Sequence, residues 1–333
     1  MSQPIKVAIV GYGNLGRGIE VSLRQSPDLE LYGVFTRRDP ADLQTLGTET
    51  KVFAVGEIAE HAADIDVAIL AGGSHRDLPA QGPELAALFN TVDSFDTHAA
   101  IPAYFESLDA PARAAGNTAL LSVGWDPGLF SLNRLFGEAV LPVGETYTFW
   151  GRGLSQGHSD AIRRVPGVAA GVQYTIPSAE AIDRVRAGQQ PELSTREKHQ
   201  RHCFVVLHDD ASPEAVRTEI VNMPNYFADY DTTVEFISAE ELARDHSAMP
   251  HGGFVLRSGT TGAEATGEAT SQVIEYSLKL GSNPQFTASV LVAYARAVCR
   301  LNEMGQTGAI TVFDVPPGLL SPKSAAQLRA ELL

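Results

Sequence analysis

The chain has 333 residues, of which 44% are hydrophobic and 20% are charged, which is enough for one large or two medium globular domains. Its formal net charge of -15 argues against non-specific binding to nucleic acid or to anionic membranes. Two widely spaced cysteines, no apolar segment near the ~20 residues that span a bilayer and no basic leader predict a soluble protein of the reducing cytoplasm.

Short apolar strands alternate with helical stretches over the first third of the chain. Strands are predicted over residues 5–10, 29–35, 66–71, 91–95 and 118–123. Helices are predicted over residues 14–25, 77–89 and about 129–139. This alternation is typical of a doubly wound, parallel α/β sheet of the Rossmann type.

Beyond residue 145 the pattern changes to strand-like runs rich in β-branched and aromatic residues. These runs are ETYTFWG, RHCFVVLHD, TTVEFIS, FVLRSG and SQVIEYSLKL, and few helices separate them. They predict a second, α+β domain with a mixed or antiparallel sheet. Ser238 and Glu241 predict a capping box that starts a short helix. Residues 259–270 form a small-residue loop, either mobile or extending a hairpin.

The carboxyl-terminal part returns to helix and strand. A helix is predicted over 286–305, with Cys299 buried in it, and a strand over GAITVFDV (308–315). Ser321 and Pro322 are expected to cap and start a last helix. This return predicts that residues 1–125 and about 300–333 form one domain, and residues about 126–299 another.

The segment GYGNLG, residues 11–16, follows the first predicted strand and opens the first helix. In this context Gly11 permits a tight turn, Gly13 allows a pyrophosphate to approach, and Gly16 allows the helix to pack closely on the strand. The helix amino terminus adds free N–H groups. The motif predicts a dinucleotide site; the alternative is a turn that serves packing alone.

The residues after the second strand indicate which dinucleotide is bound. An NAD site places an acidic residue there, whereas this chain has Thr36, Arg37 and Arg38. Two guanidinium groups and a hydroxyl suit a 2′-phosphate, and no acidic residue is present in this run to repel it. The sequence therefore predicts NADP; the alternative is an ordinary pair of surface arginines.

Acidic motifs follow two further strands of the first domain. TVDSFDTH contains Asp93, Asp96 and His98, and GWDPG contains Trp125 and Asp126. Since ligands of open α/β sheets bind outside the carboxyl ends of the strands, Asp96 and Asp126 are candidates for the crevice. Asp126 could instead cap the next helix, and Asp93 alternates inward and is expected to be structural.

The second domain places polar and aromatic residues in glycine-rich or strand-end segments: Trp150, Gln156, Asp160, Thr175, Arg201 and His251. His199 and His202 lack the cysteine or carboxylate partners of a zinc site, so no metal is predicted. The absence of a G-x-S-x-G elbow argues against acyl transfer.

These motifs together resemble the meso-diaminopimelate dehydrogenase family nearly end to end. The resemblance rests on VAIVGYGNLGR, the arginines at 37–38, TVDSFDTH, GWDPGLFS, the TFWG, GLSQGHSDA and PGV segments, QYT, MPHGG and FTAS. It implies a homodimeric, NADP-dependent dehydrogenase of lysine synthesis, with a dinucleotide-binding domain and a substrate-binding and dimerisation region. The implied reaction is the reversible oxidative deamination of meso-2,6-diaminopimelate at its D-centre, which gives L-2-amino-6-oxopimelate and ammonia.

The resemblance also implies which residues form the site. Near the reacting amino group it implies Asp96 and Asp126, with Trp125 and Trp150. Around the distal L-amino-acid end it implies Gln156, Asp160, Thr175, Arg201, His251 and Asn283. Around NADP it implies Gly11, Tyr12, Gly13, Asn14, Leu15, Gly16, Thr36, Arg37, Arg38, Ser74, His75, Arg76, Asp77, His98, Pro127, Gly128, Leu129, Phe130 and Ser131.

The residue types agree with these roles. Arg201 can bind the distal carboxylate and Asp160 the distal ammonium. Asp96 or Asp126 can orient the reacting amine, or take its proton directly or through water. Two alternatives remain: a broader D-amino-acid dehydrogenase with a relaxed distal pocket, and a catalytically silent NADP-binding regulator. Arg201, Asp160, Thr175 and His251 argue against the broader dehydrogenase, and the two crevice aspartates with Arg201 argue against the regulator.

Overall fold

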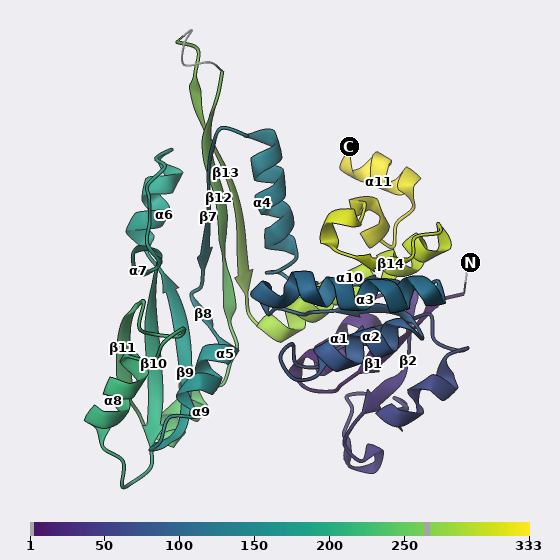
Figure 1. The fold of residues 1–333 in the computed structure, drawn as a ribbon, viewed down its shortest axis with the longest axis horizontal. Helices are drawn as coiled ribbons and strands as arrows, with labels where there is room; N and C mark the ends of the chain where they lie inside the picture. Colours follow the sequence, from purple (N-terminus) through teal and green to yellow (C-terminus); the bar gives the residue numbers. More distant parts are fainter. Residues whose placement is uncertain (1–2, 263–266) are drawn as a thin grey trace. The chain divides into compact units, whose positions relative to one another are not determined.

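A seven-stranded parallel sheet forms the centre of the first of two units (Figure 1). The computed structural model describes residues 3–262 and 267–333, and this unit contains Met1–Leu132 and Pro284–Leu333. The strands are β1 (Ile5–Val10), β2 (Leu29–Thr36), β3 (Val52–Ala54), β4 (Val67–Leu70), β5 (Asn90–Asp93), β6 (Thr118–Leu120) and β14 (Gly308–Ile310). Their order is β14-β6-β5-β4-β1-β2-β3. From β1 successive strands are added on one side, and from β4 they are added on the other, so the strand order reverses between β1 and β4. In open α/β sheets such a reversal is where ligands bind.

Helices cover both faces of this sheet, because successive strand residues point to opposite sides. Val7 and Ile9 of β1 lie in a core with α1 (Asn14–Arg24) and α10 (Asn283–Glu303). Ala8 and Val10 lie in a core with α2 (Leu78–Ala86) and α3 (Ile101–Ala115). The other helices here are α11 (Ala325–Leu332), η1 (Pro40–Asp42), η2 (Val55–His61), η3 (His98–Ala100), η5 (Val312–Asp314) and η6 (Pro317–Leu320).

The second unit, Asn133–Asn283, contains two sheets and several short helices. One sheet has the order β11-β10-β9-β8 and is parallel between β10 and β11; the other, β13-β12-β7, is antiparallel. The strands are β7 (Gly144–Trp150), β8 (Gly153–Leu154), β9 (Val168–Pro177), β10 (His199–Leu207), β11 (Asp231–Phe236), β12 (His251–Thr261) and β13 (Thr270–Leu280). The helices are α5 (Gln156–Ile162), α6 (Ala179–Arg186), α7 (Thr195–Lys198), α8 (Pro213–Val221) and α9 (Ala239–Asp245), together with most of α4 (Leu129–Val140).

The predicted fold class is confirmed in both parts: a parallel, doubly wound sheet and a separate mixed and antiparallel region. The carboxyl-terminal segment returns to the first sheet, where β14 pairs with β6. The boundaries of the units differ from those predicted: they lie after Leu132 and before Pro284, rather than near 125 and 300. The boundary lies before Pro284 rather than near 300 because α10 is one continuous helix whose buried residues, including Leu291 and Tyr294, pack in the core of the first unit.

Several local predictions are wrong. The pattern missed α3, which carries Pro102 in its first turn and Pro111 inside, and it missed β9 and most helices of the second unit. The predicted strand at 308–315 ends at Ile310, where a 3-10 turn begins. Ser324, not Ser321, caps the last helix, because its side chain accepts from the Gln327 N–H.

Other local predictions are confirmed. Ser238 caps α9 through the Glu241 N–H at 3.1 Å. Cys203 and Cys299 are buried, free thiols. The predicted 259–270 loop extends a hairpin, since residues 259–261 and Thr270 are the paired ends of the antiparallel strands β12 and β13; residues 263–266 lie outside the described part. No helix of the described residues is long and apolar enough to cross a membrane.

Candidate active site

The glycine motif forms the turn between β1 and α1. Gly11 has a φ of +94°, which L-residues rarely adopt, and its N–H donates to the Phe35 carbonyl at 2.8 Å. A Cβ at Gly16 would lie 2.3 Å from the Gly11 carbonyl oxygen, whereas a Cβ at Gly13 would meet no atom within 4 Å. Two of the glycines therefore close the turn, and the third leaves open space where a phosphate can approach the backbone.

Two adjoining cavities flank this turn and share Tyr12, Gly13 and Arg38. One is also lined by Asn14, Arg17, Asp42, Leu43 and Gln44. The other is lined by Gly11, Thr36, Arg37, Gly72 and Asp77, among others. The predicted phosphate residues are therefore brought to the glycine turn, as a dinucleotide site requires.

The two neighbouring arginines are in different environments. The Arg38 guanidinium donates to the Tyr12 carbonyl at 2.5 Å, and its backbone N–H donates to Thr36 Oγ1 at 3.1 Å. Arg37 has a 67% exposed side chain and forms an ion pair with Asp77 at 2.8 Å. The run Thr36–Arg38 itself has no acidic residue, but Asp42, four residues after Arg38, lines one cavity, and the fold brings the distant Asp77 to the other.

Turns that follow β4 and β5 complete the carboxyl edge of the sheet. Asp77 Oδ2 accepts from the Gly73 N–H at 2.9 Å and closes the turn that carries Ser74, His75 and Arg76. Ser74 Oγ accepts from the Asp96 N–H at 3.1 Å. The turn at residues 73–77 and the segment that carries Asp96 are therefore linked directly.

Asp93 is buried and structural, as predicted. Its carboxylate accepts from the Phe95 N–H at 2.9 Å, the Ser122 N–H at 3.0 Å and the Tyr104 hydroxyl at 2.8 Å. Burial raises its pKa to about 6 despite these bonds. Asp93 therefore fixes the turns after β5 and β6, whereas Asp96 is exposed and Asp126 is half-buried.

The segment after β6 forms a close turn that leads into α4. The Phe130 N–H donates to the Trp125 carbonyl at 2.8 Å, and the two rings meet edge to face at 5.3 Å. Gly128 has a φ of +127°, and its N–H donates to Ser131 Oγ at 3.1 Å. This turn holds Trp125 buried beside Asp126 and places Pro127 and Leu129 next to them in the chain.

In the second unit, Arg201 and Thr175 are cross-strand neighbours on β10 and β9. The buried Arg201 guanidinium donates to Thr175 Oγ1 and lies 3.8 Å from the centroid of the Tyr230 ring. Its Nε has no partner among the described residues, and burial lowers its pKa. A buried cation without a carboxylate partner is costly, so this guanidinium is suited to an anionic ligand.

Trp150 is held by His199, which sequence reasoning did not assign to the site. The Trp150 backbone N–H donates to His199 Nε2 at 2.8 Å, and the two rings stack with their centroids 5.3 Å apart. Burial, the Arg201 charge and the Lys198 charge lower the His199 pKa to about 3. The imidazole is therefore neutral, with its proton on Nδ1.

The remaining distal residues are only partly brought together. Gly153 pairs with Thr175, and a Cβ on it would lie 2.4 Å from the His251 ring, so His251 lies beside the Thr175 and Arg201 pair. Asp160 on α5 instead forms an ion pair with Arg163, the residue that follows this helix. The Asn283 N–H donates to the Met249 carbonyl at 2.9 Å. The side chain of Gln156 lies outside what the structure describes.

Gln173 is a further polar residue of this strand face that sequence reasoning did not single out. It is fully buried; Nε2 lies 3.4 Å from Thr175 Oγ1, and Oε1 has no partner within the described residues. Like His199 before Arg201, Gln173 precedes Thr175 by two residues. The period of a strand therefore places each pair on the same face, a signal that the sequence did contain.

Known proteins resemble this chain over nearly its whole length. The family model described as "Diaminopimelic acid dehydrogenase C-terminal domain" matches residues 124–282. The meso-diaminopimelate D-dehydrogenase of Ureibacillus thermosphaericus is 61% identical, with 99% of both chains covered. A six-substitution variant of the Clostridium tetani E88 enzyme, solved with DAP, is 50% identical with a TM-score of 0.93, covering 99% of this chain and 100% of that one. An engineered D-amino acid dehydrogenase bound to NADP+ is 44% identical with a TM-score of 0.86, over 99% and 100% of the two chains.

Proposed function

This chain belongs to the meso-diaminopimelate D-dehydrogenase family, and on that premise we propose that it oxidises meso-2,6-diaminopimelate at the D-centre with NADP. The α-carbon loses a hydride and the amino group a proton, and water then releases ammonia from the imine to give L-2-amino-6-oxopimelate. The bound nicotinamide supplies the hydride acceptor. The protein orients the two reactants and handles the proton.

The first unit is the proposed cofactor-binding domain. Gly11, Gly13 and Gly16 shape the pyrophosphate turn, and Thr36, Arg37 and Arg38 lie where a 2′-phosphate would bind. The turns 74–77, at His98 and at 127–131 are the proposed remaining contacts, together with Tyr12, Asn14 and Leu15. The open space at Gly13 and the arginine-lined cavities support this assignment.

Asp96 and Asp126 are the proposed groups at the reacting amine, with Trp125 as an apolar wall. Asp96 is exposed to solvent and Asp126 is half-buried, whereas Asp93 is fully buried. Each can therefore accept from a substrate ammonium and receive its proton, directly or through water.

The second unit is the proposed substrate-binding and dimerisation region, and the buried Arg201 carries the argument. Arg201 would bind the distal carboxylate, and Asp160 would accept from the distal ammonium. The Clostridium tetani variant replaces Gln, Thr, Arg, Pro, His and Asn. The same residue types occur here in that order at Gln156, Thr175, Arg201, Pro250, His251 and Asn283, which supports assigning these positions to one pocket.

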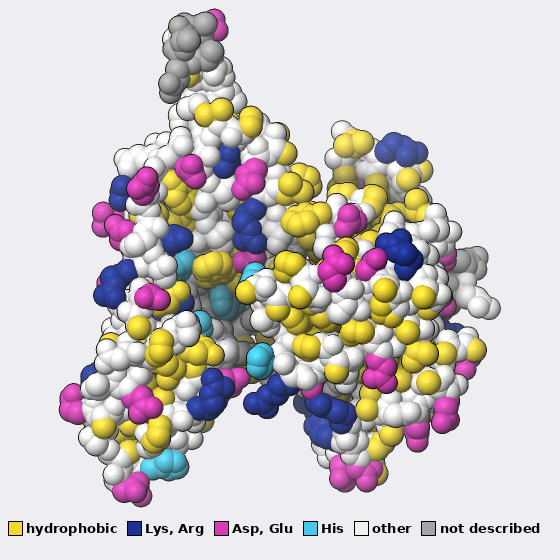
Figure 2. Space-filling model, viewed as in Figure 1, with side chains coloured by type: hydrophobic (Ala, Val, Ile, Leu, Met, Phe, Trp, Pro, Cys, Tyr) yellow, Lys and Arg dark blue, Asp and Glu magenta, His cyan; other side chains and the backbone are white. Residues whose placement is uncertain are grey.

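A homodimer is proposed through an exposed apolar surface of the second unit. This surface comprises Leu135, Phe136, Val140, Val143 and Ile274, which are 44%, 54%, 67%, 65% and 41% exposed. Figure 2 shows hydrophobic side chains at the surface over α4. Ile274 pairs with Arg257, whose guanidinium donates to the Leu141 carbonyl, so β13 presents Ile274 on the α4 side. Contiguous exposed apolar groups of this kind mark association surfaces.

The free, buried thiols of Cys203 and Cys299 support a cytoplasmic location.

The assay that tests the reaction is NADPH formation at 340 nm with meso-, LL- and DD-diaminopimelate and with D-alanine. Turnover of the meso isomer far above the others supports the proposal, because that isomer pairs a D-reacting end with an L-distal end. Comparable turnover of D-alanine would instead support a broad D-amino-acid dehydrogenase. No turnover of any substrate, with NADP bound, would support a non-catalytic NADP-binding protein.

A further inference from the structure

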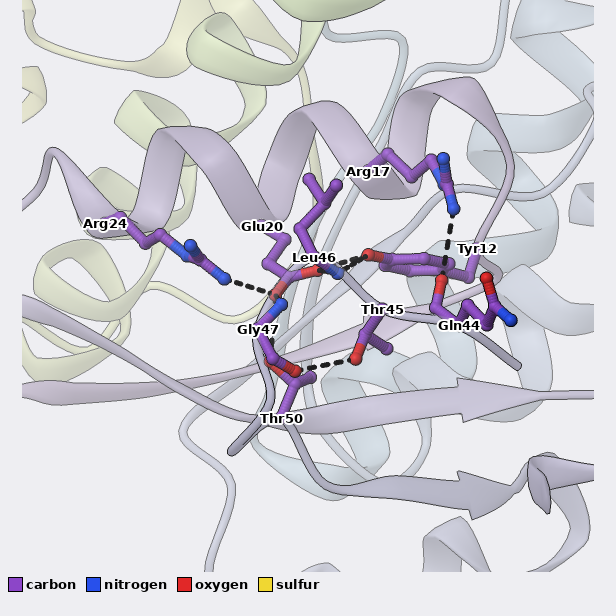
Figure 3. Close-up of polar contacts among 9 residues, drawn as sticks. All are labelled: Tyr12, Arg17, Glu20, Arg24, Gln44, Thr45, Leu46, Gly47 and Thr50. Carbon is purple, nitrogen blue, oxygen red and sulfur yellow. Dashed lines mark hydrogen bonds and ion pairs between the residues drawn. The ribbon is translucent and has the colours of Figure 1, made fainter. Parts of the chain in front are cut away.

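Glu20 on α1 is a fully buried carboxylate that accepts from Tyr12 of the glycine turn. Figure 3 shows the donors that converge on it from two parts of the chain. They are the Tyr12 hydroxyl, the Arg24 guanidinium at 2.8 Å, the N–H groups of Leu46 at 3.1 Å and Gly47 at 2.8 Å, and the Thr50 hydroxyl at 2.8 Å. Burial alone would raise the pKa of Glu20, but these bonds outweigh it and lower the pKa.

The network anchors a segment that has no helix or strand of its own. Residues 44–50 lie between η1 and β3, and three of them, Leu46, Gly47 and Thr50, donate to the Glu20 carboxylate. The Glu20 side chain therefore accepts from backbone N–H groups that, in a helix or sheet, would be paired with backbone carbonyls. The position of this segment against α1 depends on Glu20.

The first residue of the same segment, Gln44, lines an arginine-lined cavity. Its Gln44 carbonyl accepts from the Arg17 guanidinium at 3.1 Å, and that guanidinium lies 5.8 Å from the centroid of the Tyr12 ring. Arg17, Arg38, Gly13 and Gln44 all line this cavity. Two guanidinium groups therefore line a cavity beside the glycine turn, and one of them is held by the segment that Glu20 anchors.

We propose that Arg17 is a ligand of the cofactor's 2′-phosphate together with Arg38, and that Glu20 positions it through Tyr12 and residues 44–50. This inference rests on the NADP site of the proposed function. Arg37, the arginine that the sequence pairs with Arg38, already has an ion-pair partner in Asp77. Arg17 lies one turn into α1, where its charge adds to that of the helix amino terminus.

Asp42 opposes this charge in the same cavity and explains why one arginine does not suffice. The cavity lining has two guanidinium groups and one carboxylate. Without Arg17 the lining would be formally neutral, and the electrostatic preference for a phosphate over a hydroxyl would be largely lost.

The test is calorimetric titration with 2′,5′-ADP and 5′-AMP, which differ by the 2′-phosphate and require no turnover. Arg17→Met should weaken 2′,5′-ADP binding about tenfold or more and 5′-AMP binding about twofold or less. Arg113→Met, which removes a surface arginine of the same unit, is the matched control and should change neither. Equal weakening of both ligands by Arg17→Met, or no weakening, would overturn the assignment of Arg17.

Glu20→Gln tests the positioning role, because an amide cannot accept from all the donors that converge on the carboxylate. It should weaken 2′,5′-ADP binding in the same selective way and raise KM for NADP, with kcat at saturating NADP unchanged. Tyr12→Phe, which removes one donor, is the milder variant if Glu20→Gln does not fold. Selective weakening by neither variant would overturn the positioning role. If the wild-type protein itself bound 5′-AMP and 2′,5′-ADP equally, the proposed NADP site would fail instead.

Discussion

At the scale of single residues, the environment separates three aspartates that look alike in the sequence. Asp93 accepts three hydrogen bonds and is sealed from solvent, whereas Asp96 is exposed and Asp126 half-buried. Asp96 and Asp126, and not Asp93, are therefore the residues that we propose for chemistry on a substrate amine. The sequence could place all three at strand ends, and the alternation along β5 indicated that Asp93 points inward.

Replacing Asp126 by Asn should lower kcat for diaminopimelate by about a hundredfold or more, because general-base catalysis contributes ~10²–10⁴. KM for NADP should be unchanged. Steady-state kinetics of Asp126→Asn and Asp96→Asn, measured side by side, identify which carboxylate matters more. If Asp126→Asn retained wild-type turnover, Asp126 would have no catalytic role and would serve only as a helix cap.

His199 should matter through Trp150 rather than through its own charge. His199→Phe retains a ring but removes the acceptor of the Trp150 backbone N–H, whereas His199→Gln retains an acceptor without the ring. Removing the acceptor of this partly buried backbone N–H should lower the free energy of unfolding by about 1 kcal/mol in the Phe variant. KM for diaminopimelate should also rise more in the Phe variant than in the Gln variant. Urea unfolding and steady-state kinetics check both; equal behaviour of the two variants would show that the hydrogen bond is unimportant.

At the scale of elements, the glycine turn was predictable because each step of its argument is local. The apolar run, the glycine spacing and the following helix lie within one strand–turn–helix segment. The α3 helix was not recognised because Pro102 and Pro111 interrupt its pattern, although Pro102 stands in the first turn, where its missing N–H is harmless. The pairing of Arg37 with Asp77 joins turns after β2 and β4, and no local pattern indicates it.

Two neighbouring glycines of the turn should respond differently to alanine. Gly13→Ala adds a methyl into open space, so stability should change little while NADP binding weakens at least tenfold. Gly16→Ala would place its Cβ 2.3 Å from the Gly11 carbonyl oxygen, so the turn itself should be destabilised. Thermal unfolding without cofactor and NADP titration separate the two effects. A larger loss of stability in Gly13→Ala than in Gly16→Ala would contradict this account.

At the scale of the whole molecule, the chain builds its first unit from both of its ends. The sequence predicted this return from the final strand and helix, but it placed the boundary too late because α10 has apolar residues on much of its circumference. Burial of Arg201 could not be predicted either. Its partners Thr175 and Tyr230 come from other strands and turns of the second unit.

The exposed apolar surface of the second unit predicts a dimer. Phe136→Asp should add a charge to that surface and produce a folded monomer, since a charge buried without a partner at an interface is costly. Light scattering after size exclusion checks this, with Phe313→Asp as the control because Phe313 is similarly exposed in the first unit. A wild-type monomer, or a dimer that persists in Phe136→Asp, would exclude this surface.

The most direct test of the central claim is the ratio of kcat/KM for meso-diaminopimelate to that for D-alanine, in the wild-type protein and in Arg201→Met. A pocket that binds the second amino-acid head should give a wild-type ratio of about 10⁴. Arg201→Met should reduce that ratio at least a hundredfold through KM for diaminopimelate, with KM for NADP unchanged. A ratio that Arg201→Met leaves unchanged, or a parallel rise in KM for NADP, would contradict the assignment of Arg201 to the distal carboxylate.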